Sequence, residues 1–244
     1  MTDLAAVMDE PSIVLTGSFN PAIFHPLWFG QHGLLPDDEA KVKVTTKDDD
    51  ARLAQGLGIV HPRLTQFQLD WVRVQVTQDR FAAIADAGHS LPLRDLVLGT
   101  FRLLEHTPVG AMGLNRMMHF PMKDDEEWHL LGDTLAPKDF WREVLDGRPG
   151  LRSLTIEGKR HGSEARVMTV KIEPSLRVTN GIFLETNEHF GALPLEQPDP
   201  TENLKPGSAV KFMDLLAANW DASQAFVSHL ANSLVGKIRS ERRV

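Results

Sequence analysis

Apolar and polar residues alternate with a period of two in several stretches of the chain, and this pattern predicts β-strands. The predicted strands cover residues 11–18, 64–77, 109–120, 151–157, 165–172 and 177–187. In the 64–77 stretch, Phe67 and Leu69 share one face, whereas Val72 and Val74 share the other. A slip of one residue is what a β-bulge produces, so we expect a bulge near Trp71.

Apolar residues at three- and four-residue spacing predict helices over 90–105, 124–132, 137–146 and 208–239. Ser90 is the expected N-cap of the first helix. The third has Pro137 in its first turn and Gly147 just after its end. At 1.5 Å per residue the last helix would be about 45 Å long.

Strands, a helix, more strands and a long final helix are typical of the α+β class. We expect one domain over residues 1–244, with an antiparallel sheet of five to six strands packed by helices mainly on one face. The chain shows no internal repeat. Two segments, 37–50 and 191–207, are rich in charge or proline and are expected to be flexible connections.

The long C-terminal helix carries an apolar stripe whose rhythm is interrupted at Ser223. The stripe consists of Met213, Leu216, Trp220, Val227, Leu230 and Leu234. A helix of this length either lies across the whole sheet or presents its stripe to a partner, and these six residues are therefore candidate interface residues.

Composition excludes several classes of protein. The chain has no cysteine, so it can form neither a disulfide framework nor a cysteine-ligated metal site. Its formal net charge of −7 makes nucleic-acid binding unlikely, although the tail 237–244 is basic. No apolar run approaches the ~18 residues of a membrane span. We expect a cytoplasmic protein without a membrane partner.

The apolar stretch 109–120 contains Asn115, Arg116 and His119. In a strand, Arg116 would face the core or lie near a strand end, and we expect it to pair with a carboxylate. Asn115 and His119 would face the other way, beside small residues, and form either a polar binding patch or contacts to a crossing loop.

A second polar group, Glu185, Asn187 and His189, shares one face at the end of the last predicted strand. If this strand lies next to 109–120, Asn115, His119, Asn187 and His189 could converge. Two histidines and a carboxylate can hold zinc or iron, but their spacing matches no metal motif, and we predict no metal or other cofactor.

The segment FNPAIFHPLWFGQHG holds His25 and Trp28 among phenylalanines. It could form an aromatic pocket for a small molecule or a cluster that anchors a long loop.

The phrases SFNPAIFHPLWF, LLEHTPVGAMGLNRMMHF, LGDTLAPKDFW and IEPS resemble a sporadically distributed family of uncharacterised bacterial proteins. The resemblance touches about half of the chain and rests mainly on HTPVGAMGLN and GDTLAPKDFW. It implies a bacterial or phage-related cytoplasmic protein and brings no activity or catalytic residue.

Three functions remain open. The first is a non-enzymatic interaction or assembly module that binds a protein partner or itself, because catalytic signatures are missing and the long helix carries an apolar stripe. The second is a helix-grip-like binder of a small apolar ligand, with a cavity of roughly 300–1,000 Å³. The third is a metal-dependent hydrolase that uses His119, His189 and a carboxylate.

Overall fold

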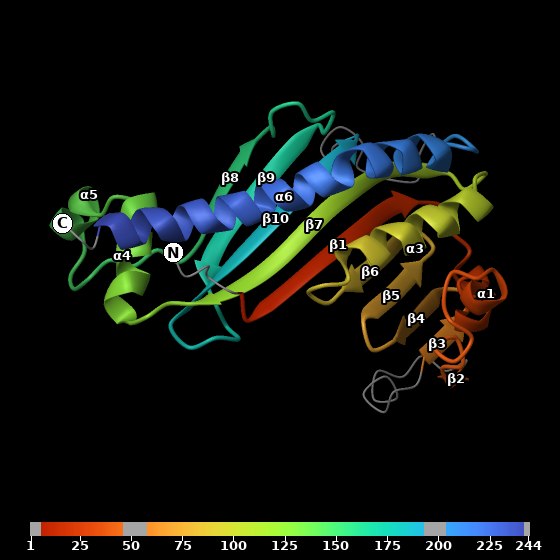
Figure 1. The fold of residues 1–244 in the computed structure, drawn as a ribbon. Helices are drawn as coiled ribbons and strands as arrows, with labels where there is room; N and C mark the ends of the chain where they lie inside the picture. Colours follow the sequence, from red (N-terminus) through yellow and green to blue (C-terminus); the bar gives the residue numbers. More distant parts are fainter. Residues whose placement is uncertain (1–5, 46–57, 193–203, 242–244) are drawn as a thin grey trace.

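A single ten-stranded sheet forms the centre of the protein, with strand order β2-β3-β4-β5-β6-β1-β7-β10-β9-β8 (Figure 1). The computed structural model describes residues 6–45, 58–192 and 204–241. The strands are β1 (Met8–Gly17), β2 (Val44–Thr45), β3 (Gly58–His61), β4 (Leu64–Gln68), β5 (Val72–Thr77), β6 (Arg80–Ala85), β7 (Val109–Pro121), β8 (Leu154–Gly158), β9 (Val167–Pro174) and β10 (Gly181–Gly191). The two-residue β2 runs parallel to β3, and the other paired strands are antiparallel.

The fold class is α+β as predicted, but the prediction of five to six strands was wrong. The predicted bulged strand 64–77 is a hairpin that reverses at residues 69–71, where the Leu69 N–H donates to the Val72 carbonyl over 2.8 Å. Because the chain reverses there, Phe67 and Val74 face the same core from neighbouring strands, and no bulge is needed. The short strands β2, β3 and β6 were missed altogether.

The helices are η1 (Pro21–Ile23), α1 (Pro26–Gln31), α3 (Ser90–Leu103), α4 (Asp125–Leu135), α5 (Asp139–Val144) and α6 (Ala209–Glu241). Helices α3, α4, α5 and α6 agree with the four predicted helices to within a few residues, whereas η1 and α1 were not among the predicted helices. The predicted N-cap was wrong, because His89 caps α3 without a side-chain hydrogen bond. Ser90 instead accepts a hydrogen bond from the Trp220 indole over 3.2 Å, which ties α3 to α6.

The order of elements repeats along the chain. In the first half, β1 is followed by short helices, the β4-β5-β6 meander and α3. In the second half, β7 is followed by the short helices α4 and α5, the β8-β9-β10 meander and α6. Strands β1 and β7 pair antiparallel at the middle of the sheet, so each half carries its meander outward from this pair. The sequence has no visible repeat, and only the topology reveals this arrangement.

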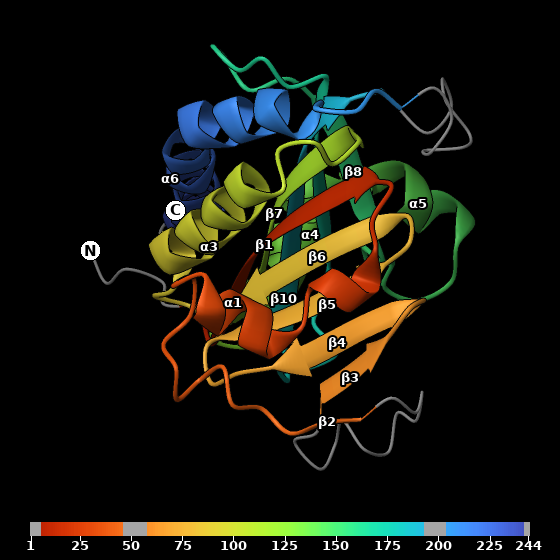
Figure 2. The ribbon, with the colours of Figure 1, turned by 90° about the vertical axis from the view of Figure 1, so that its right-hand side faces the viewer.

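The helices α3 and α6 lie on one face of the sheet, and α1 packs beside α3 (Figure 2). Two apolar clusters lie under the helices: a larger one built around Phe24, Phe81, Phe101 and Trp220, and a smaller one built around Phe120, Leu184 and Val227. Helix α6 contributes to both and runs nearly the full length of the molecule (Figure 1).

The two segments predicted to be flexible lie partly outside the described residues. Of 37–50 the structure describes residues up to 45, which include a turn and β2, and of 191–207 it describes 191–192 and 204–207. The basic tail is described only up to residue 241.

Candidate functional site

Arg116 faces α6 and is neutralised within the chain, as its predicted inward position requires. Its Nε and Nη2 donate to the two carboxylate oxygens of Asp9 over 2.8 and 2.7 Å, and its Nη1 donates to the Gln224 carbonyl and to Ser228. The guanidinium lines a cleft of about 240 Å³ between α6 and the start of α3. Four of its five N–H groups are used by these bonds, so it has little capacity left for a ligand.

A second buried polar group lies between β10 and α6. Glu188 is fully buried, and its Oε1 accepts from Arg160 over 3.0 Å and from Ser163. Arg160 also donates to Asn219 of α6. Oε2 of Glu188 has no partner among the described residues. This group holds the β8–β9 turn against α6 and was not predicted, because nothing in the sequence pairs Arg160 with Glu188.

Asn115 and Asn187 face away from the helices and do meet, because β10 pairs with β7 in the register that places them opposite each other. The Asn187 amide donates to Oδ1 of Asn115, and Asn115 donates to the Gly113 carbonyl. A Cβ on Gly113 would lie 2.8 Å from Nδ2 of Asn187, so this glycine provides room for the amide pair.

His119 lies on the same face but is 6% exposed and has its own partner. Its Nδ1 lies 2.8 Å from Oγ of Ser175, which already accepts from the backbone N–H groups of Arg177 and Val178. The Ser175 hydroxyl therefore donates to Nδ1, and the ring carries its hydrogen on Nε2. Burial lowers the pKa of His119, the positive charge of Arg177 lowers it further, and Glu10 opposes the shift.

His119 and His189 do not converge, contrary to the expectation for a metal site. His119 lies opposite Phe183 and His189 opposite Gly113, so six residue positions separate them along the paired strands. At about 3.4 Å per residue this is roughly 20 Å, too far for one ion. His189 Nε2 instead lies 2.8 Å from the Ala192 carbonyl. The described parts of the chain contain no group of three potential metal ligands.

The aromatic segment after β1 is a packed cluster. His25 is the N-cap of α1, and its Nδ1 accepts from the Leu27 N–H over 3.1 Å. The Trp28 ring lies against His32, with ring centres 4.7 Å apart and planes tilted by 56°, and it also contacts Phe24 and Phe29. Both candidate residues serve to fix the loop.

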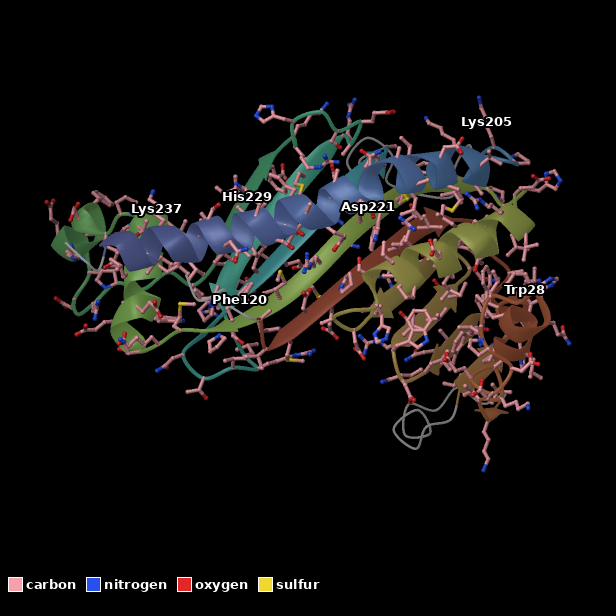
Figure 3. The ribbon with its side chains drawn as sticks, viewed as in Figure 1. Trp28, Phe120, Lys205, Asp221, His229 and Lys237 are labelled. Carbon is pink, nitrogen blue, oxygen red and sulfur yellow. The ribbon has the colours of Figure 1, made fainter. Side chains whose placement is uncertain are left out.

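Most of the apolar stripe of α6 is core rather than a free interface. Met213, Leu216, Trp220 and Val227 are buried against the chain's own sheet. Leu230 and Leu234 are only partly buried. Polar residues mark the outer side of α6, where Asp221, His229 and Lys237 follow one another along the helix, at the opposite end from Trp28 (Figure 3). Four of the six stripe residues therefore belong to the core, because α6 lies across the sheet, and only Leu230 and Leu234 remain partly accessible.

A different apolar surface is exposed on α5. Phe140, Trp141, Val144 and Leu145 are 63%, 47%, 56% and 53% exposed, and α5 has no buried residue. We call these four residues the α5 surface. Their spacing places them on one side of the helix, and the rings of Phe140 and Trp141 meet edge to face at 5.2 Å. The sequence predicts this helix, but its periodicity suggests a packed side and does not reveal the exposure.

The link from α4 to α5 is held by the buried side chain of Lys138. Its Nζ donates to the Gly132 carbonyl over 2.7 Å and to the Ala136 carbonyl, and it lies 3.7 Å from Asp133. A cation at the C-terminal end of α4 also complements the helix dipole. These residues belong to the segment GDTLAPKDFW, so this segment builds the support from which Phe140 and Trp141 project.

Charged side chains of both signs border the α5 surface, and the basic ones are Arg142 and Arg148. Asp139, Glu143 and Asp146 are exposed, and Arg142 pairs with Asp139 and Asp133.

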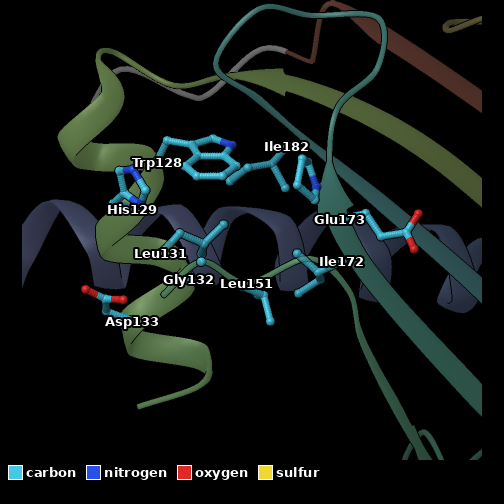
Figure 4. Close-up of a pocket in the computed structure, with 11 residues that line it drawn as sticks. Trp128, His129, Leu131, Gly132, Asp133, Leu151, Ile172, Glu173 and Ile182 are labelled. Carbon is cyan, nitrogen blue, oxygen red and sulfur yellow. The ribbon is translucent and has the colours of Figure 1, made fainter. Parts of the chain in front are cut away.

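The hollow next to α4 is too small for a ligand. Figure 4 shows Trp128, Leu131, Ile172 and Ile182 around it, with Asp133 farther out along α4. Its volume is about 20 Å³, enough for one water molecule. A neighbouring apolar hollow under α6 has the same volume, so neither of these two hollows has the size expected for a helix-grip ligand.

A larger hollow of about 340 Å³ lies at the other end of the molecule. It is lined mainly by Phe19, Ile23, Phe24, Leu103 and Leu104.

Neither the protein-family models nor the curated proteins give a match to this chain. The resemblance carried by HTPVGAMGLN and GDTLAPKDFW therefore stays an expectation. In the part of the chain that the structure describes, no helix has both the length and the apolarity to span a bilayer.

Proposed function

We propose that this protein is a non-enzymatic docking module that binds another protein through the α5 surface. The observation that carries the proposal is the exposure of four neighbouring large apolar side chains on a helix with no buried residue. Contiguous apolar patches of this kind are typical of protein–protein contact sites. Phenylalanine and tryptophan are enriched in the cores of protein interfaces, and tryptophan is also enriched among the residues that dominate binding energy.

The polar candidates support a binding role over a catalytic one. Arg116, His119, Asn115 and Asn187 all have partners within the chain. The support given by Lys138 means that the α5 surface is presented at a fixed position, which lowers the entropy lost on binding.

The acidic residues around the α5 surface define the chemistry of the partner. It should offer an apolar groove with lysine or arginine opposite the exposed Glu143 and Asp146, whereas Asp139 is already paired with Arg142. In line with the resemblance, the partner would belong to a bacterial or phage-related assembly.

Site-specific photocross-linking tests the proposal. A benzophenone amino acid is placed at position 140 or 141 of the full chain, which is then expressed in the organism that encodes it. The matched control carries the same group at Leu176, which is 99% exposed but stands outside the α5 surface. We expect one protein to be cross-linked from 140 and 141 and not from 176.

The cross-linked protein is then purified and titrated by calorimetry. Trp141→Asp should weaken binding at least about 30-fold, the effect of a hot-spot residue. Glu143→Lys should weaken it and reduce its dependence on salt, whereas Leu176→Asp should leave it unchanged. The proposal fails if positions 140, 141 and 176 give the same products, or if Trp141→Asp binds as tightly as the natural chain.

A small apolar ligand in the 340 Å³ hollow is the second candidate function. Its volume lies within the usual range for ligand sites, and phenylalanine and leucine line it. Ile23→Trp should fill the hollow. If this function holds, native mass spectrometry of the protein from its own host should show a bound small molecule that the variant lacks. An unliganded natural chain would remove this candidate.

A further inference from the structure

Strand β8 lies at one edge of the sheet, and the corresponding strand in the first half of the chain has a further strand paired with its outer edge. In the repeated order, β8 corresponds to β4. The outer edge of β4 pairs antiparallel with β3. Among the described residues no strand pairs with the outer edge of β8. The second half therefore lacks the strand that completes the first.

The side of β8 that faces the helices is also uncovered. Ile156 is 55% exposed, whereas Phe67 on β4 is fully buried. In the first half, the turn around Pro21 covers β4 and accepts a hydrogen bond from Thr65 over 2.7 Å. No comparable cover is described over Ile156.

Partly buried apolar residues continue this surface toward α6. Val170 lies opposite Ile156 on the neighbouring strand. Phe226 and Leu230 follow Asn219 by seven and eleven residues and so lie on the same side of α6, the side from which Asn219 contacts Arg160 at the β8–β9 turn. Val170, Phe226 and Leu230 all pack against the same apolar cluster, and together with the edge of β8 they make up the proposed apolar strip.

The edge of β8 is short and carries the charge of Glu157, but it lacks three other features that prevent strand addition. Its sequence, LTIEG, contains no proline and no lysine, and its pairing with β9 is regular without a bulge. Natural edge strands are usually protected by such features.

We propose that a second copy of this chain occupies this edge, with β8 pairing antiparallel to β8 of the partner about a twofold axis at Ile156. A twofold contact needs a self-complementary surface. In this alignment Ile156 lies beside its own copy, Thr155 lies opposite Glu157, and Leu154 lies opposite Gly158. No like charges face each other within the strand, and Arg160 is held inward by Glu188.

The expected dimer is weak. Five residues of strand and a narrow apolar strip bury less than the roughly 1,200 Å² typical of stable complexes. We therefore expect monomers near 1 μM and a growing dimer fraction near 100 μM. This inference concerns a surface separate from the α5 surface and does not depend on the proposed function.

The absence of cysteine from the chain allows a direct test. Ile156→Cys introduces the only thiol, and directly opposed residues of antiparallel strands have Cα atoms about 4.5–5.5 Å apart, within the range of disulfide geometry. At 100 μM with a mild oxidant, Ile156→Cys should form a covalent dimer at least about tenfold faster than Leu176→Cys, whose thiol is more exposed. Equal rates would overturn the proposal.

Sedimentation velocity of the unmodified chain provides the second readout. Ile156→Lys should abolish the concentration-dependent dimer without unfolding the protein, since Ile156 is already exposed, and Leu176→Lys should have no effect. The proposal is overturned if the natural chain stays monomeric at 500 μM, if Ile156→Lys still dimerises, or if Trp141→Asp rather than Ile156→Lys removes the dimer.

Discussion

The ion pair between Asp9 and Arg116 should make a large and strongly coupled contribution to stability. Both side chains are about 15% exposed, and the bidentate pair joins β1 to β7 beneath α6. Removing one partner of a buried pair costs about 3–5 kcal/mol, because the other charge is left uncompensated. For a pair with slight exposure we expect about 3 kcal/mol for Asp9→Leu and a similar loss for Arg116→Met.

The double variant separates the charge effect from packing. Asp9→Leu with Arg116→Met leaves no isolated charge, although the bonds from Nη1 to Gln224 and Ser228 are lost. We expect it to lose about 3 kcal/mol rather than the 6 kcal/mol of additive losses, which is a coupling of about 3 kcal/mol.

Urea unfolding followed by circular dichroism measures these values, and thermal unfolding should show a decrease of about 6–12 °C for each single variant. Arg94→Met is the matched control, because its partner Asp221 is 72% exposed, and it should cost less than about 0.5 kcal/mol. Additive losses, or an Asp9→Leu variant as stable as the control, would refute the reasoning.

Three further predictions concern stability. Gly113→Ala should lower the unfolding free energy by about 1 kcal/mol in chemical unfolding, because the new Cβ would meet the Asn187 amide. Most of this loss of stability should disappear when Asn187→Ala is added, and equal losses with and without Asn187→Ala would contradict the reason given. The lowered pKa of His119 means that the unfolded chain binds a proton more readily than the folded chain, so the unfolding free energy should decrease as the pH falls below about 6.5. The His119→Gln variant should show a smaller decrease between pH 7.5 and 5.5, and a decrease equal to that of the natural chain would exclude this role. Trp220→Ala should lower the unfolding free energy by about 3–5 kcal/mol because Trp220 is fully buried, whereas Trp141→Asp should lower it by less than about 0.5 kcal/mol. Thermal unfolding of both variants measures this, and a larger destabilisation by Trp141→Asp would contradict the prediction.

Helix positions and the inward orientation of Arg116 could be predicted because they depend on local periodicity. The number of strands could not be predicted, because a chain reversal at Asp70 and a bulge at Trp71 produce the same change in the alternation of apolar and polar residues. Strand β6, RFAAIA, shows little alternation since small alanines occupy both of its faces.

The sequence could offer the pairing of β10 with β7 only as one possibility. The register of this pairing places Asn187 beside Asn115 but His189 far from His119. Register, which no local pattern fixes, decided which polar residues meet. Exposure was equally inaccessible: the apolar residues of α5 and α6 have similar spacing, yet α6 is buried and α5 is not, because the sheet extends under only one of them.

The central β1–β7 pair has a consequence for how the chain folds during synthesis. Everything that β1 contacts on its β6 side is complete by residue 103, but its other edge stays open until β7 and residue 121 have left the ribosome. The first half then exposes a ten-residue strand edge whose natural partner is still to come. Slow translation of residues 104–121 should therefore lengthen the interval in which nascent chains can associate through β1, and fast translation of this segment should improve the yield of soluble protein.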